Sequence, residues 1–356
     1  MKASIIIALD SSYNFTEVFL GHLCRYATLS EYELIFTDDG NDEVDYKHLL
    51  DIYIKNYYYI PHKNKHGYGI VNNHAVQHSH NDILIFMNSD IILTEKCLET
   101  LITSLHEHNA VAVQPLLIYP QTNLVQSTGH VFNKLYNAHL FENRNISDPI
   151  VQTAGIRKSL TTALCVMYKN VFLAYNGFDE FYFNAWEGME LMLKLSLNGE
   201  ICFYEPKAVA YHIRGGGRGQ YFIDETPQTA RFWTCWGDKI NENITDAYLM
   251  QLSETMLLKK YIVINFSCIT NLESIFEKLP IKIIKYVNYC ELAKMDKIEF
   301  FKELPYAYST LNSCFIFFSN NFKNILNNRL WFTMRGDKQD YIMDLSGNLI
   351  KDRKST

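Results

Sequence analysis

The sequence contains no run of roughly 18 apolar residues, the minimum for a membrane-spanning helix. Its first residues, MKASIIIALD, make a short apolar run that meets an acid at once, which is typical of a buried strand and not of a signal peptide. We therefore expect a cytoplasmic protein. Any membrane contact would be peripheral, at the inner face of the membrane.

Blocks of like charge and paired cysteines are absent too. The 33 basic and 39 acidic residues are interspersed and give a net charge of −6, so an electrostatic nucleic-acid binder is not expected. The eight cysteines are dispersed without a Cys-x-x-Cys pair. In a chain of 356 residues, which can bury a substantial core, this pattern indicates reduced core cysteines and no structural zinc site.

The first third of the chain alternates apolar strand-like runs with helical patterns. The predicted strands are 4–9, 32–37, 57–62, 82–88 and 110–115. The predicted helices are 15–28, 47–56, 69–80 and 94–108. This alternation predicts an α/β fold of the Rossmann-like type, with a mostly parallel central sheet flanked by helices.

The pattern becomes irregular after about residue 115 and restarts near 260. Between these points we expect a hairpin at 118–132, a polar loop at 142–160, a helix at 187–198 and two short strands within 201–213. The glycine-rich RGGGRGQ at 214–220 predicts a mobile loop. We divide the chain into a domain at 1–243, a connecting helix at 244–259 and a smaller α/β domain at 260–356, whose predicted helices are 271–279 and 294–304.

An acid interrupts the apolar segment ILIFMNSDIIL at 83–93. Because ligands of parallel sheets bind beyond the carboxyl ends of the strands, Asp90 with Asn88 beside it could hold a hard cation such as Mg²⁺ or Mn²⁺. The simpler alternative is strand-to-helix punctuation, with Thr94 as the N-cap of the next helix.

Two further acidic segments admit both a functional and a structural interpretation. Asp38 and Asp39 end a strand in LIFTDDGNDE, where a carboxylate could bind a ribose or a base, but the same residues favour a turn. In WEGMEL, Glu187 and Glu190 begin a helix. They could be placed there by the helix dipole, or Glu187 could act as a general base with Trp186 as an apolar wall.

Histidines give a weaker signal than the acids. His212 follows a strand and precedes the glycine-rich loop, and a lone histidine is more often a structural residue than a ligand. The histidines at 62, 66, 74, 78 and 80 show no convincing metal-ligand spacing.

Taken in order, the segments SIIIALD, DDGND, GYGIVNN, FMNSD, GFDEFYF, WEGMEL and YHIRGGG resemble the GT-A glycosyltransferases of family 2. The resemblance covers roughly residues 1–240. It implies a GT-A catalytic domain at 1–243 that moves a sugar from a nucleoside-diphosphate sugar, a UDP-sugar being favoured, with inversion of configuration.

The resemblance also implies a role for each matched residue. Residues that would hold the nucleoside are Ala8, Asp10, Asp39, Gly67 and Asn73. The family's Asp-x-Asp motif matches Asn88, Ser89 and Asp90, with Asp90 as the ligand of Mn²⁺ or Mg²⁺ and Asn88 in place of the first acid. His212 would complete the metal or diphosphate site, and Arg214 and Arg218 would close over the diphosphate.

The chain departs from the family pattern at the start of the 187–198 helix. The family's Glu-Asp pair usually supplies the catalytic base from its Asp, and that position is Gly188 here. We expect Glu187 to take the base role, with Trp186 and Glu190 beside it at the sugar nucleotide. The base could otherwise lie elsewhere or be absent.

The resemblance to the transferases implies an acceptor, and two other functions compete with it. The expected acceptor is a glycan or lipid-linked glycan of bacterial surface polysaccharide or glycoconjugate synthesis. The rivals are a non-catalytic GT-A-like binding or scaffold subunit, which Gly188 favours, and a sugar nucleotidyltransferase. The latter should carry a glycine-rich basic loop after the first strand, but ALDSSYNFTE has no Gly, Lys or Arg. Acceptor binding, homo-oligomerisation and bracing all stay open as roles of 260–356.

Overall fold

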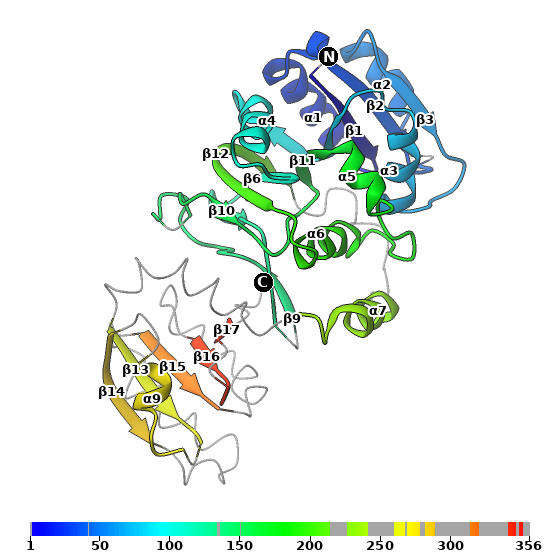
Figure 1. Ribbon diagram of the computed structural model, residues 1–356. Coiled ribbons are helices and arrows are strands. Elements are labelled where there is room, and N and C mark those ends of the chain that lie inside the picture. The colour runs from blue at the N-terminus through cyan, green and yellow to red at the C-terminus, as the bar shows by residue number, and fades with distance from the viewer. Residues whose placement is uncertain are drawn as a thin grey trace. The chain divides into compact units, whose positions relative to one another are not determined.

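The computed structural model describes residues 2–41, 43–133, 136–149, 151–213, 226–240, 260–267, 269–277, 282–288, 314–319, 341–346 and 349–351. The chain divides into two compact units, Met1–Asn241 and Glu242–Thr356 (Figure 1). Three predicted features lie outside the described residues, namely the loop at 214–220 and the helices at 244–259 and 294–304.

A mixed sheet forms the centre of the first unit. Its strand order is β10-β12-β6-β11-β4-β1-β2-β3, with β5 paired to β12 and β7 paired to β6. The bounds are β1 Ala3–Leu9, β2 Tyr32–Asp38, β3 Tyr58–Pro61, β4 Ile83–Asn88, β5 Ile91–Leu93, β6 Ala112–Ile118, β7 Val125–Ser127, β10 Gly155–Ile156, β11 Leu164–Tyr168 and β12 Cys202–His212. Strands β4, β1, β2 and β3 run parallel to one another, and β12 runs parallel to β6, while β11 is antiparallel to both β4 and β6. The predicted α/β fold with a mostly parallel sheet is confirmed.

Helices cover both faces of this sheet (Figure 1). Their bounds are α1 Tyr13–Tyr26, α2 Tyr46–Tyr53, α3 Tyr68–Gln77, α4 Cys97–Glu107, α5 Lys169–Ala174, α6 Glu187–Leu197 and α7 Thr226–Trp236. Successive strand residues point to opposite faces, so Ile5 and Ile7 of β1 pack with α1, α2 and α4, while Ile6 packs with α3, α5 and α6. A continuous apolar strand such as SIIIAL is buried on both sides for this reason.

The segment after β4 differs from its simpler interpretation. Asp90 is followed by the short strand β5, which pairs antiparallel with β12, and not by a helix. Helix α4 begins only at Cys97, after Lys96 in the left-handed conformation (φ 60°), and the Thr94 hydroxyl donates to the backbone oxygen of Val209 (2.6 Å). Thr94 is therefore not an N-cap, and the prediction of strand-to-helix punctuation is wrong.

Two other local predictions need correction. The residues expected as two short strands within 201–213 form one strand, β12, with a register shift between Glu205 and Val209. The expected hairpin at 118–132 is only partly present, because β7 turns back onto β6 while β8 (His130–Asn133) pairs with β9 (Tyr136–His139) in a separate two-stranded sheet.

The second unit has its own sheet, in the order β14-β13-β15-β16-β17. Its bounds are β13 Lys260–Asn265, β14 Lys282–Asn288, β15 Cys314–Phe318, β16 Tyr341–Met343 and β17 Leu349–Lys351, with the short helix α9 at Glu273–Phe276. Strands β13 to β16 are parallel and β17 is antiparallel. This unit is a small α/β structure, as predicted, and its core includes Val263, Ile264 and Phe317.

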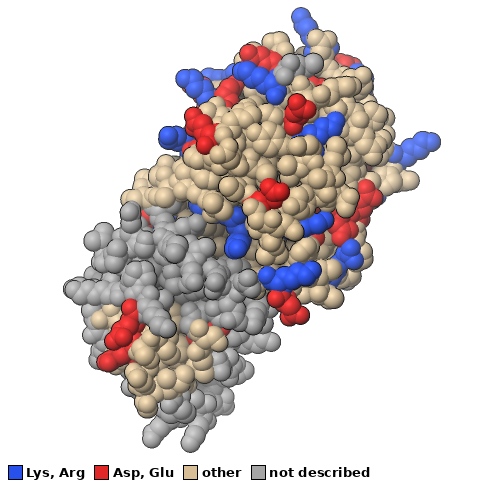
Figure 2. All heavy atoms as spheres, viewed as in Figure 1, with Lys and Arg blue, Asp and Glu red and all other residues tan. Residues whose placement is uncertain are grey.

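The charged side chains of the visible face are of both signs and interspersed (Figure 2). In the described part of the chain, no helix combines the length and apolarity needed to cross a membrane. Cys24, Cys97, Cys165, Cys202 and Cys235 are free thiols, and Cys97, Cys165 and Cys202 are buried.

Candidate functional site

The carboxyl ends of β1, β2 and β4 open into one pocket. Register pairs Ala8 with Asn88 and Leu9 with Asp38, so the polar residues that follow these strands meet at one edge of the sheet. The pocket has a volume of about 380 Å³, within the usual range for small-molecule sites. Its lining consists of Ala8, Asp10, Ser11, Asp39, Tyr68, Val71, Asn88, Ser89, Asp90, Gln126, His130, His139, Thr161, Thr162, Ala163, Asn184, Ala185, Trp186, Glu187, Gly188, Met189 and His212.

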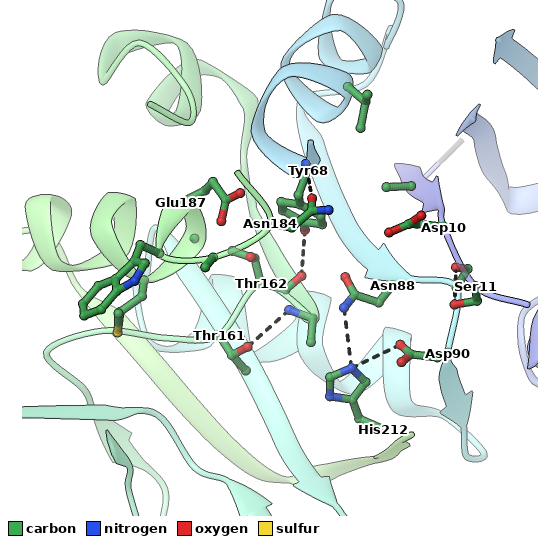
Figure 3. A pocket seen from close by; sticks show the side chains of 18 of the residues that line it. Asp10, Ser11, Tyr68, Asn88, Asp90, Thr161, Thr162, Asn184, Glu187 and His212 are labelled. Carbon is green, nitrogen blue, oxygen red and sulfur yellow. Dashed lines mark hydrogen bonds and ion pairs between the residues drawn. The ribbon is translucent and has the colours of Figure 1, made fainter. Parts of the chain in front are cut away.

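Three groups of side chains surround the cavity (Figure 3). Asp10 and Ser11 lie on one side, Glu187 and Thr162 lie on the opposite side, and Asn88 and His212 lie between them. The pocket therefore brings together residues from the three separate segments that sequence reasoning had left ambiguous, around Asp39, Asp90 and Glu187.

Asp10 and Asp39 form the acidic side of the pocket. The ammonium group of Lys65 lies 2.6 Å from Asp10 Oδ1. Burial raises the pKa of Asp10, and the ion pair with Lys65 opposes that rise. Lys65 thus places a cation at an edge where the strand-end sequence ALDSSYNFTE showed none.

The Asp39 carboxylate is 2% exposed and ties two segments together. It accepts hydrogen bonds from the backbone N–H groups of His66 (2.7 Å) and Gly67 (3.0 Å). Burial raises the Asp39 pKa, while these two donors lower it. Gly67 is required here because its φ is +91° and an added Cβ would lie 2.7 Å from the ring of Phe183. Gly67 therefore does not line the pocket, but its backbone N–H holds Asp39, which does.

Asp90 and His212 face each other in the middle of the site. His212 Nε2 lies 3.1 Å from Asp90 Oδ1 and 3.5 Å from Asn88 Nδ2, and both Asp90 and His212 are largely buried. Ser89 lies between Asn88 and Asp90 in the sequence. It does not join this pair, and its hydroxyl group donates to Ser11 Oγ (2.9 Å).

Gln126 sets the orientation of the His212 ring. Its Nε2 donates to the backbone oxygen of His212 (3.1 Å), which leaves its Oε1 to accept from His212 Nδ1 (2.6 Å). In the neutral ring, a hydrogen on Nδ1 leaves the lone pair on Nε2, which is the ring nitrogen next to Asp90. This is the arrangement that protein metal sites use to orient a ligating histidine.

The donor set fits a divalent cation bound together with a ligand. Carboxylate and imidazole suit Mn²⁺, and Mg²⁺ also takes carboxylate oxygens with water and phosphate. Among the described residues, no group of three or more His, Cys, Asp or Glu side chains is arranged to hold a metal by itself. Asp90 and His212 would thus supply part of the coordination shell, and oxygen atoms of a bound ligand and of water would supply the rest.

The N-terminus of α6 forms the wall opposite Asp10. Trp186 precedes the helix with φ 76° and its ring packs on Phe232 of α7 (centroids 4.6 Å apart). Glu187 is 3% exposed and packs against α3, where an added Cβ at Gly69 would lie 3.3 Å from Glu187 Cγ. Tyr68 N–H donates to Asn184 Oδ1 (2.6 Å) and joins the same wall.

Some predicted residues lie away from the cavity. Asn73 holds the 178–180 loop by bonding the backbone of Phe178 and the Glu180 carboxylate. Glu190 accepts from Trp236 Nε1 (3.0 Å) and is absent from the lining, and burial raises its pKa. Arg214 and Arg218 lie outside the described residues.

Sequence reasoning missed the residues that close the pocket from the irregular region. Gln126, His130 and His139 belong to β7, β8 and β9, and Thr161 and Thr162 precede β11. No motif marks them in the sequence. The only general signal was the rule that binding residues gather on irregular segments held by a rigid sheet.

Comparison with known proteins shows which sequences this chain resembles. Residues 4–164 match the family model described as glycosyl transferase family 2. The O-antigen biosynthesis protein RfbC of Myxococcus xanthus is 23% identical over 206 residues, which are 56% of this chain and 16% of that protein. This chain therefore spans only a small part of that relative.

Two solved structures are similar to this chain. GalNAc-T7, crystallised with UDP, GalNAc and Mn2+, superposes with a TM-score of 0.53 at 11% identity, covering 72% of this chain and 51% of that one. The mannosyltransferase PcManGT of Pyrobaculum calidifontis, in complex with GDP-Man and Mn2+, has a TM-score of 0.48 at 12% identity, covering 70% of this chain and 72% of that one. The likeness to GalNAc-T7 bears on fold alone and supports the predicted GT-A architecture.

Proposed function

We propose that this chain, whose residues 4–164 match the model of glycosyl transferase family 2, moves a sugar from a nucleoside-diphosphate sugar to an acceptor hydroxyl with inversion of configuration. One observation carries the proposal. A single pocket joins an acidic strand edge, the Asp90–His212 pair and a buried glutamate on the opposite wall. These are the three parts that nucleoside binding, diphosphate binding and proton removal need.

The acidic edge is the proposed nucleoside side. Asp10 and Asp39 lie where acids of Rossmann-like sheets bind ribose or base, with Ala8 beneath them. A UDP-sugar is the favoured donor. Its diphosphate would extend from this edge toward Asn88, Asp90 and His212.

Asp90 and His212 are the residues that would hold Mn²⁺ or Mg²⁺. The bound cation supplies positive charge that offsets the negative charge gathering on the departing nucleoside diphosphate. Gln126 fixes the tautomer and the direction of His212, and Ser89 with Ser11 fixes the loop that carries Asp90.

The proposed chemical step is a single displacement. Glu187 removes the proton of the acceptor hydroxyl while that oxygen bonds to the anomeric carbon. The bond from the anomeric carbon to the diphosphate oxygen breaks, and its electron pair leaves with the nucleoside diphosphate. Because attack comes from the face opposite the leaving group, configuration inverts. The half-buried Trp186 ring beside Glu187 would pack on the sugar and exclude water.

The proposed acceptor is a glycan or lipid-linked glycan of a bacterial surface polysaccharide. Support comes from the relative named as an O-antigen biosynthesis protein, although this chain covers 16% of its length. Arg214 and Arg218 stay predictions for closure over the diphosphate.

A donor screen tests the proposal. Purified protein is incubated with UDP-, GDP- and dTDP-sugars plus Mn²⁺, and the release of nucleoside diphosphate is followed for the wild type and Asp90→Ala. Asp51→Ala, on an exposed helix position paired with Lys47, is the control. We expect turnover of at least one donor that Asp90→Ala loses and Asp51→Ala keeps. Failure to bind or turn over any donor contradicts the transferase.

A second variant separates the transferase from a binding subunit. Glu187→Gln keeps the shape of the side chain but cannot accept a proton, so we expect donor binding at wild-type affinity with transfer reduced by about 100-fold or more. Glu200→Gln, at the other end of the α6 region, controls for the loss of a charge. Transfer at the wild-type rate by Glu187→Gln would place the base on another residue. Binding without turnover by the wild type would favour the scaffold function.

A further inference from the structure

Gly188 has no room for a side chain. A Cβ added there would lie 2.6 Å from Thr162 Cγ2 and 2.8 Å from Thr162 Cβ, and closer still to the Thr162 hydroxyl oxygen. Thr162 therefore occupies the space that a side chain at position 188 would fill. Both residues line the pocket, so the polar group presented at this point is the Thr162 hydroxyl.

Hydrogen bonds to the backbone of residues 161–163 hold Thr162 in place. The Tyr68 hydroxyl donates to the Thr162 backbone oxygen (3.0 Å), and Thr161 N–H donates to Gln114 Oε1 (2.9 Å). The backbone N–H of Asn88 donates to the oxygen of Ala163 (2.8 Å). Burial raises the pKa of the Tyr68 hydroxyl, so the first of these donors keeps its proton.

The hydroxyl lies on the wall that also carries Glu187. Figure 3 shows Thr162 and Glu187 on the same side of the pocket, away from Asp10. Gly188 follows Glu187 in the first turn of α6, so Thr162 fills the side-chain space of the residue next to Glu187 in the sequence. A hydroxyl and a carboxylate thus line the same wall of the pocket.

We propose that Thr162 is an acceptor-orienting residue, whose hydroxyl hydrogen-bonds the attacking oxygen while Glu187 takes its proton. This inference rests on the proposed function. A hydroxyl suits the position because it is neutral and both donates and accepts hydrogen bonds. A carboxylate at 188 would lie close to Glu187 and make its ionised form, which the base requires, less favourable.

Donor hydrolysis tests the role without knowledge of the acceptor, because water is then the attacking oxygen. Thr162→Val keeps the shape and removes the hydroxyl, so kcat for hydrolysis should fall about tenfold, the effect of one lost hydrogen bond, while the donor KM stays unchanged. Thr162→Ser restores the hydroxyl and should stay within about threefold of wild type. Thr153→Val, which removes an exposed hydroxyl bonded to Pro149, is the matched control.

Hydrolysis by Thr162→Val at the wild-type rate would overturn the inference, since packing alone would then explain Thr162. A rise in donor KM with unchanged kcat would overturn it too, because the hydroxyl would then contribute to donor binding and not to the position of the attacking oxygen. If the wild type binds and hydrolyses no nucleotide sugar at all, the proposed function itself fails and this inference falls with it.

A second measurement tests the geometry independently of turnover. Gly188→Ala should lower the unfolding temperature by several degrees, because the new methyl group overlaps Thr162. Adding Thr162→Gly should recover part of that loss by emptying the same space. A Gly188→Ala variant as stable as the wild type would show that Thr162 does not fill this position.

Discussion

Replacing Gln126 with Leu should weaken metal binding without touching a metal ligand. Gln126 is 2% exposed and makes two hydrogen bonds to one residue, accepting from His212 Nδ1 (2.6 Å) and donating to its backbone oxygen (3.1 Å). Leucine removes both. The His212 ring is then free to rotate or to move its hydrogen to Nε2, and either change takes the lone pair away from Asp90.

The size of the effect follows from these contacts. Loss of an orienting partner of a ligating histidine costs about 10- to 100-fold in metal affinity, or about 1.4 to 2.8 kcal/mol. The buried His212 N–H and carbonyl left unpaired add about 1–3 kcal/mol of lost folding stability. Gln126→Leu should therefore both bind Mn²⁺ more weakly and unfold more easily.

Titration calorimetry with Mn²⁺, in the absence and presence of UDP, measures the affinity, and urea unfolding measures the stability. The control is Gln114→Leu, because Gln114 is also fully buried but bonds Thr161 N–H and lies outside the pocket lining. We expect both variants to lose stability and only Gln126→Leu to lose affinity for Mn²⁺. Equal Mn²⁺ affinities in Gln126→Leu and the wild type would refute the orienting role.

Three further predictions rest on other parts of the first unit. Asp39→Asn replaces an oxygen that accepts a backbone N–H, so UDP affinity by calorimetry should fall and unfolding should require about 1–3 kcal/mol less; unchanged UDP affinity would remove Asp39 from the nucleoside site. Phe232→Ala empties a fully buried site beneath Trp186 and should cost about 3–5 kcal/mol by urea unfolding, and a loss under about 1 kcal/mol would contradict this packing. Burial, with two neighbouring histidines, lowers the pKa of His74 from its ordinary 6.5, so the unfolded chain takes up the proton first and stability should fall as pH drops through that value. His74→Asn should flatten this dependence in urea unfolding between about pH 8 and pH 5, and an unchanged slope would contradict the prediction.

The acidic edge of the pocket could be predicted from the sequence because parallel strands follow a simple rule. The runs at 4–9, 32–37 and 83–87 are buried on both faces, and the polar residues after each run must reach the same sheet edge. Asp39 and Asp90 therefore line the same pocket although 51 positions separate them in the sequence.

Other contacts at the pocket could not be predicted in this way, because loops and short strands make them. Gln126 reaches His212 only because β7 folds back on β6 while β6 pairs with β12. Lys65 reaches Asp10 from a loop before α3. Contacts of this kind depend on tertiary pairing and have no local periodicity, so no sequence pattern marks them.

The two acids that begin α6 show where a local pattern stops being informative. Glu187 and Glu190 are three residues apart, and both suit the positive end of the helix dipole. The local sequence pattern therefore does not show which of them faces the pocket. Tertiary packing separates them. Trp236 of α7 donates its indole N–H to Glu190 and leaves it in a structural contact, whereas Glu187 packs on the glycine of α3 and lines the pocket. The proposal of Glu187 and not Glu190 as the base therefore depends on contacts with α7 and α3, two elements more than a hundred residues apart in the chain.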